Sequence, residues 1–311
     1  MRAVLLCPGQ GAQKVGMGKD LAAEYPAARE VFEAVDDALG VPLSRLMWEG
    51  PEEELTLTHN AQPAILTHSL AAWAVVSAAV QPVAGAGHSL GEYSAYAAAG
   101  ALAPTDAARL VRRRGELMYE AGQARPGTMA AVIGLDVEAV GRECAAASTE
   151  AEVAVPANLN APDQCVISGD PAAVERAGAA LKAAGAKRVL PLKVSGAFHS
   201  PLMEPAAEGL RAELAQVPFA APAFAVIANA AAEPVSEADE ARRLLGEQLT
   251  APVRWVESMQ RAAADAGEDT TFVEVGPGSV LSGLLRKIAK GTPSLALGTA
   301  EQVNAFLEQH A

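Results

Sequence analysis

Basic side chains, cysteines and long apolar runs are all scarce in this chain of 311 residues. Lys and Arg number 24 against 37 Asp and Glu, which gives a net charge of −13. A chain this acidic lacks the dense positive field that general binding to nucleic acid or to an anionic membrane requires. No stretch reaches the ~18 apolar residues of a membrane span, and the apolar run at residues 3–7 is shorter than a signal-peptide core. We therefore expect neither nucleic acid nor a membrane among the partners.

Cysteine and histidine are too few and too scattered for a disulfide framework or an evident metal site. The three cysteines, Cys7, Cys144 and Cys165, form no CxxC pair, and the five histidines include no HxxxH pair. The sequence therefore gives little support to a bound metal. An odd number of widely spaced cysteines is typical of a reducing compartment, so we expect a cytoplasmic protein.

Hydrophobic residues, by contrast, make up 50% of the chain and are arranged in short runs that alternate with helical patterns. Runs that predict buried strands cover residues 3–7, 83–87, 224–228, 271–275 and 294–297. Apolar residues recur at helical spacing over residues 21–39, and further helices are predicted at residues 60–79 and 105–122, with Thr105 as the expected N-cap of the last. Alternating strands and helices, with the strands apolar throughout, indicate an α/β fold whose parallel sheet is covered on both faces.

The middle of the chain departs from this order. Between residues 128 and 194 the predicted elements run strand, helix, strand, strand, helix, strand, which is the ferredoxin-like order. We therefore predict a ferredoxin-like subdomain at residues 125–194, inserted into a larger α/β domain formed by residues 1–124 and 195–311.

A G-x-S-x-G pattern, from Gly87 to Gly91, lies between a predicted strand and a predicted helix. In this setting the serine occupies a sharp turn, and the following helix points its positive end at the hydroxyl. Ser89 is therefore a candidate nucleophile. The alternative interpretation is an ordinary strand–helix turn, because the bare pattern also arises by chance in glycine-rich chains.

A serine nucleophile needs a base, and His199 follows a predicted strand on a loop of the kind that carries catalytic groups. The alternative for a single histidine is a surface imidazole or one satisfied in the core. His88 is adjacent to Ser89 but is interpreted as structural. No carboxylate stands out as the third member of a Ser-His-acid set.

A second glycine cluster, Gly9-Gln10-Gly11, follows the first predicted strand. Lys14 stands where a dinucleotide fingerprint needs its third glycine. Gly11 and Gly16 have the spacing of a P-loop, but Met17 follows Gly16 where that motif continues with Lys and then Ser or Thr. What remains is a tight loop with free backbone N–H groups at the carboxyl end of a strand. Such a loop is a suitable place for an oxyanion donor.

Three consecutive arginines at residues 112–114 fan around a predicted helix, so at most one or two of them can face a pocket. An arginine that faces inward would recognise a carboxylate through two parallel charged hydrogen bonds. The alternative is a solvated helix face with acidic partners.

Six motifs along the chain together indicate a specific protein family. They are PGQGAQ, GHSLGEYSA, RRRGELM, GAFHSPLM, EQLTAPVRW and VEVGPG. In their order and spacing the sequence resembles the malonyl-CoA:acyl carrier protein transacylases of fatty-acid synthesis, and it is also similar to the acyltransferase domains of polyketide synthases. The resemblance covers about residues 3–298 and implies an α/β-hydrolase-like large domain with a ferredoxin-like insert.

The resemblance also implies the catalytic residues. It makes Ser89 the nucleophile that carries the malonyl group, His199 its base, and Gln248 the residue whose carbonyl orients the histidine in place of a carboxylate. The backbone N–H groups of Gln10 and Leu90 correspond to the oxyanion hole.

Four further residues are implied for the substrate pocket. Arg114 matches the arginine that grips the malonyl carboxylate, Gln62 matches the pocket glutamine, and Met118 belongs to the same motif as Arg114. Phe198 precedes the histidine as a bulky aromatic does in malonyl-selecting polyketide relatives, whereas many transacylases of fatty-acid synthesis have a serine there.

The implied reaction is a two-step transfer that needs no metal or redox cofactor. Ser89 takes the malonyl group from malonyl-CoA, and the phosphopantetheine thiol of an acyl carrier protein then removes it. The alternatives are a discrete polyketide-pathway acyltransferase, a serine thioesterase or hydrolase, and a non-enzymatic carrier-docking module. Gln248 and Arg114 argue against the hydrolase, and the presence of Ser89, His199 and Arg114 together argues against an inactive module.

Carrier proteins are strongly acidic, so docking on a chain with a charge of −13 requires a local basic patch near the site. Arg286, Lys287 and Lys290 are the best candidates, on the helix predicted after the VGPG motif. Arg286 and Lys290 are four residues apart and are expected to share a helix face. The alternative is a solvated helix end whose cations favour the helix dipole.

Overall fold

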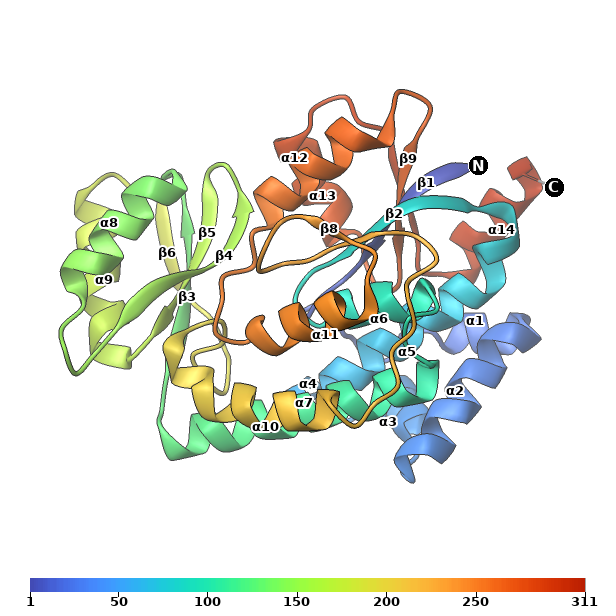
Figure 1. The fold of residues 1–311 in the computed structure, drawn as a ribbon, viewed down its shortest axis with the longest axis horizontal. Coiled ribbons are helices and arrows are strands. Elements are labelled where there is room, and N and C mark those ends of the chain that lie inside the picture. The colour runs from blue at the N-terminus through green and yellow to red at the C-terminus, as the bar shows by residue number, and fades with distance from the viewer. Residues whose placement is uncertain (311) are drawn as a thin grey trace.

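The larger of two sheets forms the centre of the protein in the computed structural model, which describes residues 1–310 (Figure 1). Its six strands lie in the order β10-β9-β1-β2-β7-β8, and all neighbouring pairs are parallel except β7 with β8. The strands are β1 (Arg2–Cys7), β2 (Gln81–Gly87), β7 (Val226–Ile227), β8 (Pro234–Val235), β9 (Thr271–Val275) and β10 (Ser294–Leu297). The predicted α/β class with a parallel sheet is confirmed.

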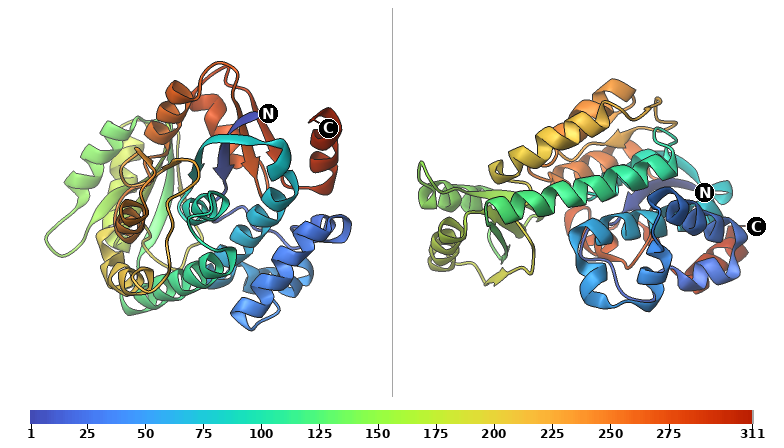
Figure 2. Two further views of the ribbon diagram at one scale, coloured as in Figure 1. Left: turned by 45° about the vertical axis from the view of Figure 1, so that its right-hand side comes forward. Right: turned by 90° about the horizontal axis from the view of Figure 1, so that it is seen from below.

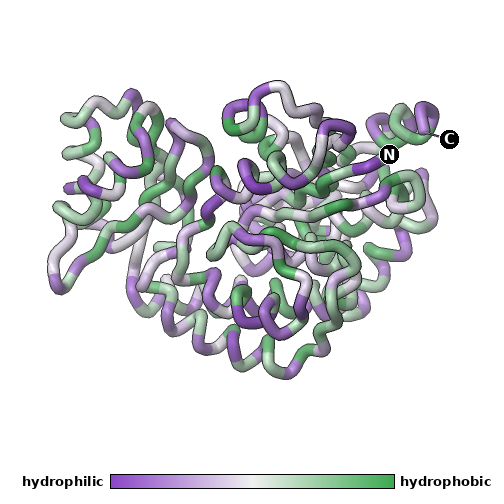
Figure 3. Tube along the Cα trace, turned by 45° about the horizontal axis from the view of Figure 1, so that its top comes forward, coloured by the Kyte–Doolittle hydropathy of each residue, from purple (hydrophilic) through white to green (hydrophobic). Residues whose placement is uncertain are grey.

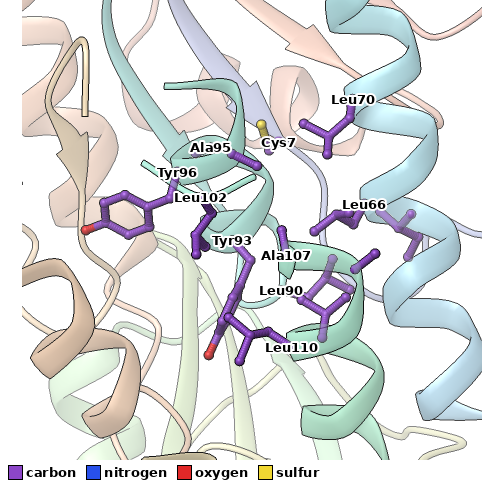
Figure 4. Close-up of a cluster of buried hydrophobic side chains, with 14 of the residues drawn as sticks. Cys7, Leu66, Leu70, Leu90, Tyr93, Ala95, Tyr96, Leu102, Ala107 and Leu110 are labelled. Carbon is purple, nitrogen blue, oxygen red and sulfur yellow. The ribbon is translucent and has the colours of Figure 1, made fainter. Parts of the chain in front are cut away.

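Alternating residues of β1 belong to two different cores, one on each face of this sheet. Ala3, Leu5 and Cys7 belong to the core that includes α5 (Thr58–Val76) and α7 (Pro104–Ala124), whereas Val4 and Leu6 belong to the core that includes α12 (Trp255–Ala266) and α13 (Val280–Ile288). Figure 4 shows part of the first core, where side chains of α5, α6 (Gly91–Ala98) and α7 lie with Leu90. Both faces of the sheet are therefore covered, which accounts for the uninterrupted apolar character of the strand sequences.

The helices of the large part lie between most of these strands along the chain. They are α1 (Lys19–Glu24), α2 (Pro26–Leu39), α3 (Leu43–Glu49), α4 (Glu52–Thr56), α5 (Thr58–Val76), α6 (Gly91–Ala98), α7 (Pro104–Ala124), α10 (Glu204–Leu214), α11 (Ala238–Glu247), α12 (Trp255–Ala266), α13 (Val280–Ile288) and α14 (Ala300–His310), with short 3-10 turns η1 (Ser77–Ala79) and η2 (Pro201–Met203). The predicted N-cap of α7 is wrong. That helix begins at Pro104 with Ala103 as its N-cap, because the fixed φ of proline suits the first helical position.

The second sheet is antiparallel and is formed by the middle of the chain. Its strands lie in the order β4-β5-β3-β6, and they are β3 (Thr128–Ile133), β4 (Ala154–Ala161), β5 (Gln164–Gly169) and β6 (Arg188–Pro191). Helices α8 (Val137–Ala147) and α9 (Pro171–Ala183) share a small core with one face of this sheet. The element order is the predicted ferredoxin-like one, and we propose residues 125–194 as the bounds of the unit.

The helix α7 leads from the large part into the small one, as the right-hand view of Figure 2 shows. The chain returns beside the end of this helix, because a Cβ on Gly122 would lie only 2.1 Å from the backbone oxygen of Ser195. The two parts also share backbone hydrogen bonds, from Leu159 N to Val253 O (2.9 Å) and from Val253 N to Ala157 O (2.8 Å). The small sheet is thus attached to the large part at several points.

The distribution of hydrophobic and hydrophilic residues agrees with this arrangement of two sheets and their helices. Figure 3 shows hydrophobic stretches in both parts of the chain, with hydrophilic residues along the outer turns. Among residues 1–310, no helix combines the length and the apolar character that crossing a bilayer demands.

Candidate active site

Ser89 occupies a sharp turn between the end of β2 and the start of α6. Its φ of 53° lies in the left-handed region that non-glycine residues rarely adopt. The flanking glycines allow this turn, because a Cβ on Gly87 would lie 1.9 Å from the Gly91 carbonyl carbon and one on Gly91 would lie 2.1 Å from Cys7 O. The turn therefore presents the serine hydroxyl at the carboxyl edge of the sheet.

His199 faces this hydroxyl from the loop that follows the small part. The distance between Ser89 Oγ and His199 Nε2 is 2.8 Å. On the other side of the ring, Nδ1 lies 3.0 Å from the main-chain oxygen of Gln248 and 3.2 Å from that of Ala251. A carbonyl oxygen can only accept a hydrogen bond, so Nδ1 carries the ring proton and Nε2 is free to accept the proton of the serine.

The surroundings of His199 keep its imidazole neutral. Burial lowers the pKa of His199 to about 3, and the guanidinium of Arg114 acts in the same direction. The two carbonyl contacts oppose this effect without cancelling it. At neutral pH the ring is therefore in the form that can act as a base.

Two backbone amides beside Ser89 are available as donors. Among residues 1–310, neither Gln10 N nor Leu90 N donates a hydrogen bond to another residue. Leu90 immediately precedes α6, and Gln10 lies on the loop after β1, where its side-chain oxygen accepts a 2.8 Å hydrogen bond from Thr58 Oγ1. That these two N–H groups form the oxyanion hole stays a prediction.

Arg114 is the one member of the arginine run that reaches this site. Its side chain is buried, with 1% exposure, and Nη2 lies 3.0 Å from Ser89 Oγ and 2.9 Å from Gln248 Oε1. Nη1 donates to Gln62 Oε1 at 2.6 Å. Arg112 and Arg113 instead form ion pairs with glutamates near the surface. Within residues 1–310, no carboxylate lies within 4.0 Å of Arg114, so its charge has no direct ionic partner.

A cavity of about 400 Å³ opens in front of the serine and the histidine. The large part contributes Met118 and Phe198 to its walls, and the small sheet contributes Met129 and Val166. Gln62 lies behind this wall and donates to the sulfur of Met118 at 3.2 Å. The site therefore lies between the two sheets, and both parts of the chain shape it.

His88 turns away from Ser89. Its Nε2 bonds to Asn160 Oδ1 of β4 at 2.8 Å, and its ring packs against Trp255 with centroids 5.4 Å apart. It thus ties the nucleophile turn to the small sheet.

Sequence reasoning missed two buried residues beneath the nucleophile, Asn229 and Glu92. Asn229 Oδ1 accepts a 2.7 Å hydrogen bond from Ser89 N, and Glu92 Oε2 accepts one of 3.0 Å from Asn229 N. Asn229 carried no signal in the sequence. Glu92 did carry one, because it is the only acid in the otherwise apolar and small-residue stretch of α6.

The basic residues near the end of α13 are only partly placed as expected. Arg286 and Lys287 are exposed in its last turn, and Lys287 Nζ lies 3.4 Å from Oε1 of Gln164, which lines the cavity. The expectation that Arg286 and Lys290 share a helix face is wrong, since α13 ends at Ile288. The chain turns there toward β10 through Gly291, which has a φ of 86°.

A parallel sheet with a serine on a strand–helix turn, a histidine held by carbonyls and two free amides defines a serine-dependent acyl-transfer enzyme. Residues 4–303 match the acyl transferase domain family, and the chain belongs to that family. The resemblance to malonyl-CoA:acyl carrier protein transacylases is likewise confirmed by its relatives.

Three of these relatives illustrate the match. The malonyl CoA-acyl carrier protein transacylase of Bacillus subtilis (strain 168) is 44% identical over 99% of this chain and 96% of its own length. The acyl carrier protein S-malonyltransferase structure from Vibrio cholerae is 42% identical with a TM-score of 0.93, covering 98% of this chain and 99% of that one. A malonyl-transacylase solved in complex with a type II PKS acyl-carrier protein is 41% identical with a TM-score of 0.93, covering 99% of both chains.

Proposed function

We propose that this protein transfers malonyl groups from malonyl-CoA to the phosphopantetheine thiol of an acyl carrier protein through a malonyl-serine intermediate. One observation carries the malonyl assignment. The buried guanidinium of Arg114 has no ionic partner within residues 1–310 and lies 3.0 Å from Ser89 Oγ. An acyl group on that oxygen with a free carboxylate at its far end would supply the missing negative charge.

Acylation begins when His199 Nε2 takes the proton of Ser89 and Oγ attacks the thioester carbonyl. The N–H groups of Gln10 and Leu90 stabilise the resulting oxyanion, each contributing roughly 10²–10³ in rate. The C–S bond then breaks, and His199 returns the proton to the sulfur of the departing CoA. The malonyl group remains on Ser89 as an ester.

The second half of the reaction runs the same steps in reverse. The carrier's thiol gives its proton to His199 and attacks the ester, and Ser89 recovers the proton as it leaves. No atom is oxidised or reduced in either half, and each acyl acceptor is a thiol or an alcohol. We therefore propose that the enzyme works without a resident cofactor or metal, CoA entering only as part of the substrate.

The pocket residues have distinct proposed roles. Arg114 pairs with the malonyl carboxylate, Gln62 holds the guanidinium, and Met118 forms the pocket wall. Phe198, which is buried at the cavity wall, crowds the α-carbon of the acyl group and so disfavours methylmalonyl.

A second candidate is a discrete acyltransferase of a polyketide pathway. Phe198 favours it, and so does the similarity to a transacylase solved with a type II PKS acyl-carrier protein. A hydrolase is less well supported, because carbonyl oxygens rather than a carboxylate orient His199. The three free, buried cysteines support the further proposal that the protein works in the cytoplasm.

The proposed function is tested by mixing the protein with malonyl-CoA and measuring its intact mass. We expect a malonyl adduct that peptide mapping places on Ser89 and that a carrier protein removes as malonyl-carrier. Rapid loss of the adduct to water, with no transfer to the carrier, would instead indicate a hydrolase.

Arg114→Ala is expected to discriminate between acyl groups. Malonyl transfer should fall by about 2–4 kcal/mol, because the substrate carboxylate loses its charged partner in a buried site. Acetyl transfer, which brings no carboxylate, should fall much less or rise. The two rates are compared with Arg113→Ala as the matched control, since Arg113 is the neighbouring surface arginine. Equal losses for both acyl groups would make Arg114 a structural residue.

The basic end of α13 is proposed to dock the carrier. The double substitution Arg286→Glu with Lys287→Glu should weaken malonyl transfer to the carrier while leaving acylation by malonyl-CoA nearly intact. The defect should appear in the association rate and shrink as salt is raised. Lys290→Glu tests separately whether the residue beyond the helix contributes.

A charge-matched control is available on the helices of the small part. Arg142 on α8 and Lys182 on α9 are exposed, and these helices pack on the sheet face whose side chains form the small core. Changing both to glutamate should leave transfer to the carrier unaltered. Loss with the α13 variant in both half-reactions would point to CoA binding, and loss in neither would place the docking surface elsewhere.

A further inference from the structure

Glu92 is a buried acid that the two-step reaction leaves without a role. It lies in the first turn of α6, three residues after Ser89, and its side chain is fully shielded from solvent. Oε2 accepts hydrogen bonds from Asn229 N at 3.0 Å and from Gln248 Nε2 at 2.7 Å. Oε1 has no partner within residues 1–310. A carboxylate in such a place needs a compensating interaction.

The two residues that Glu92 holds are the ones that hold the backbone of Ser89. Asn229 Oδ1 accepts from Ser89 N at 2.7 Å, and Gln248 Nε2 donates to Ser89 O at 2.9 Å. The left-handed backbone conformation of Ser89 is strained, and a strained conformation persists only where surrounding contacts hold it in place. The side chains of Asn229 and Gln248 thus bond both backbone polar groups of Ser89, and both residues donate to the same Glu92 oxygen, Asn229 through its backbone N–H and Gln248 through its side-chain amide.

The side-chain amide of Gln248 also connects Glu92 to Arg114. Its Oε1 accepts from Arg114 Nη2 at 2.9 Å, while its Nε2 donates to Glu92. A buried negative charge and a buried positive charge are therefore connected through one amide group instead of meeting directly. A direct pair would occupy the guanidinium, whereas this arrangement leaves its donors on the side of Ser89 for a substrate carboxylate.

The surroundings act on Glu92 in two directions. Burial raises the pKa of Glu92 to about 7, while the hydrogen bonds from Asn229 and Gln248 and the charge of Arg114 favour its ionised form. The ring of Tyr93 lies against the guanidinium of Arg114, whose central carbon is 5.6 Å from the ring centroid.

Resting on the function proposed above, we propose that Glu92 is the positioning residue of this site. Its carboxylate fixes the backbone of Ser89 through Asn229 and Gln248, and its charge balances Arg114 through Gln248. It touches neither substrate nor the reacting atoms.

Two substitutions separate the hydrogen bonds from the charge. In Glu92→Gln the carbonyl oxygen can still accept from both donors, but the negative charge is lost. In Glu92→Leu the volume is similar, and both hydrogen bonds are lost as well. Glu274→Gln is the matched control, because Glu274 is equally buried and also accepts two hydrogen bonds, from Leu281 N (3.0 Å) and Ser282 N (2.7 Å) at the start of α13.

Single-turnover acylation by malonyl-CoA and by acetyl-CoA measures both effects. Glu92→Leu should lower the acylation rate constant about 10²-fold for both substrates, the scale expected when a reacting group is misplaced by about 1 Å. Glu92→Gln should keep that rate constant within about fivefold, because both acceptor contacts remain. It should also lower the malonyl-CoA concentration at half-maximal rate by roughly three- to tenfold, since a second buried negative charge no longer opposes the substrate carboxylate. The value for acetyl-CoA and both values for Glu274→Gln should stay within about twofold of wild type.

The reaction of Ser89 with a fluorophosphonate probes the same positioning without malonyl or a carrier. It should slow in Glu92→Leu and persist in Glu92→Gln, so this result stands even if malonyl proves not to be the substrate. Should Glu92→Leu fail to fold, Glu92→Asp replaces it, because the shorter side chain keeps the charge but cannot reach both donors, and at least a tenfold loss is expected. A folded Glu92→Leu that reacts at the wild-type rate overturns the positioning role. An unchanged malonyl-CoA dependence in Glu92→Gln overturns the charge-balancing role.

Discussion

Replacement of Ser89 by alanine is expected to abolish the malonyl adduct that the wild-type protein forms with malonyl-CoA. Ser89 Oγ lies 2.8 Å from Nε2 of His199, the proposed base, and 3.0 Å from Nη2 of Arg114, the proposed partner of the malonyl carboxylate. It sits beside two amides that have no other acceptor among residues 1–310. Without Oγ, no atom at this position can attack the thioester, whatever the rest of the site contributes.

The measurement is the intact mass of the protein after incubation with malonyl-CoA, followed by peptide mapping. Ser94→Ala is a suitable control, because Ser94 is a buried serine on α6, the helix that follows the Ser89 turn. It should acquire the adduct normally. An adduct on Ser89→Ala at some other residue would show that Ser89 is not the nucleophile.

His199→Ala is expected to slow acylation by about 10²–10⁴, the usual range for loss of a general base. Among residues 1–310, the imidazole is the only group within hydrogen-bond reach of Ser89 Oγ that can accept its proton, since the other neighbour is the Arg114 guanidinium. Stopped-flow measurement of CoA release in a single turnover gives the rate constant. A variant with nearly full rate would require a different base.

The same residue predicts the pH profile. Because the pKa of His199 is lowered to about 3, its neutral form persists as the pH falls through the ordinary histidine range. The acylation rate constant should therefore show no loss centred near pH ~6.5, where an exposed histidine would protonate. The profile is best measured in Glu92→Gln, where the neighbouring carboxyl no longer titrates. A clear loss at that pH would mean that His199 is protonated more readily than its burial implies.

The site residues that could be predicted are those whose chemistry requires a local sequence pattern. Ser89 is announced by its glycines, and the glycines are required because neighbouring backbone atoms would collide with a Cβ at either one. His199 follows from the need for a base, although only the folded chain brings it to Ser89 across 110 residues. Asn229 could not be found in this way, because its contact with Ser89 spans 140 residues and its neighbours are alanines.

The fold shows the same limit. The long helix α5 and the six elements of the small part were predicted with small errors at their ends. The strands β7 and β8 have two residues each, too few to display a period of two, and β8 was missed. The end of α13 was also misplaced. The helix was expected to include Lys290, but it ends at Ile288, and the chain turns at Gly291.

The close approach of Gly122 to Ser195 makes the large part continuous in space where it is interrupted along the chain. The ends of the insert enter and leave side by side, so closing the gap with a short turn would cost little chain entropy. This is the geometry that tolerates the exchange of one module for another. The cavity sets the limit on such exchange, because Met129 and Val166 belong to the insert while Ser89 and His199 do not. A chimaera carrying a foreign insert would inherit an intact nucleophile and base together with a new wall for the acyl chain, so grafting at this junction offers a route to altered acyl selectivity.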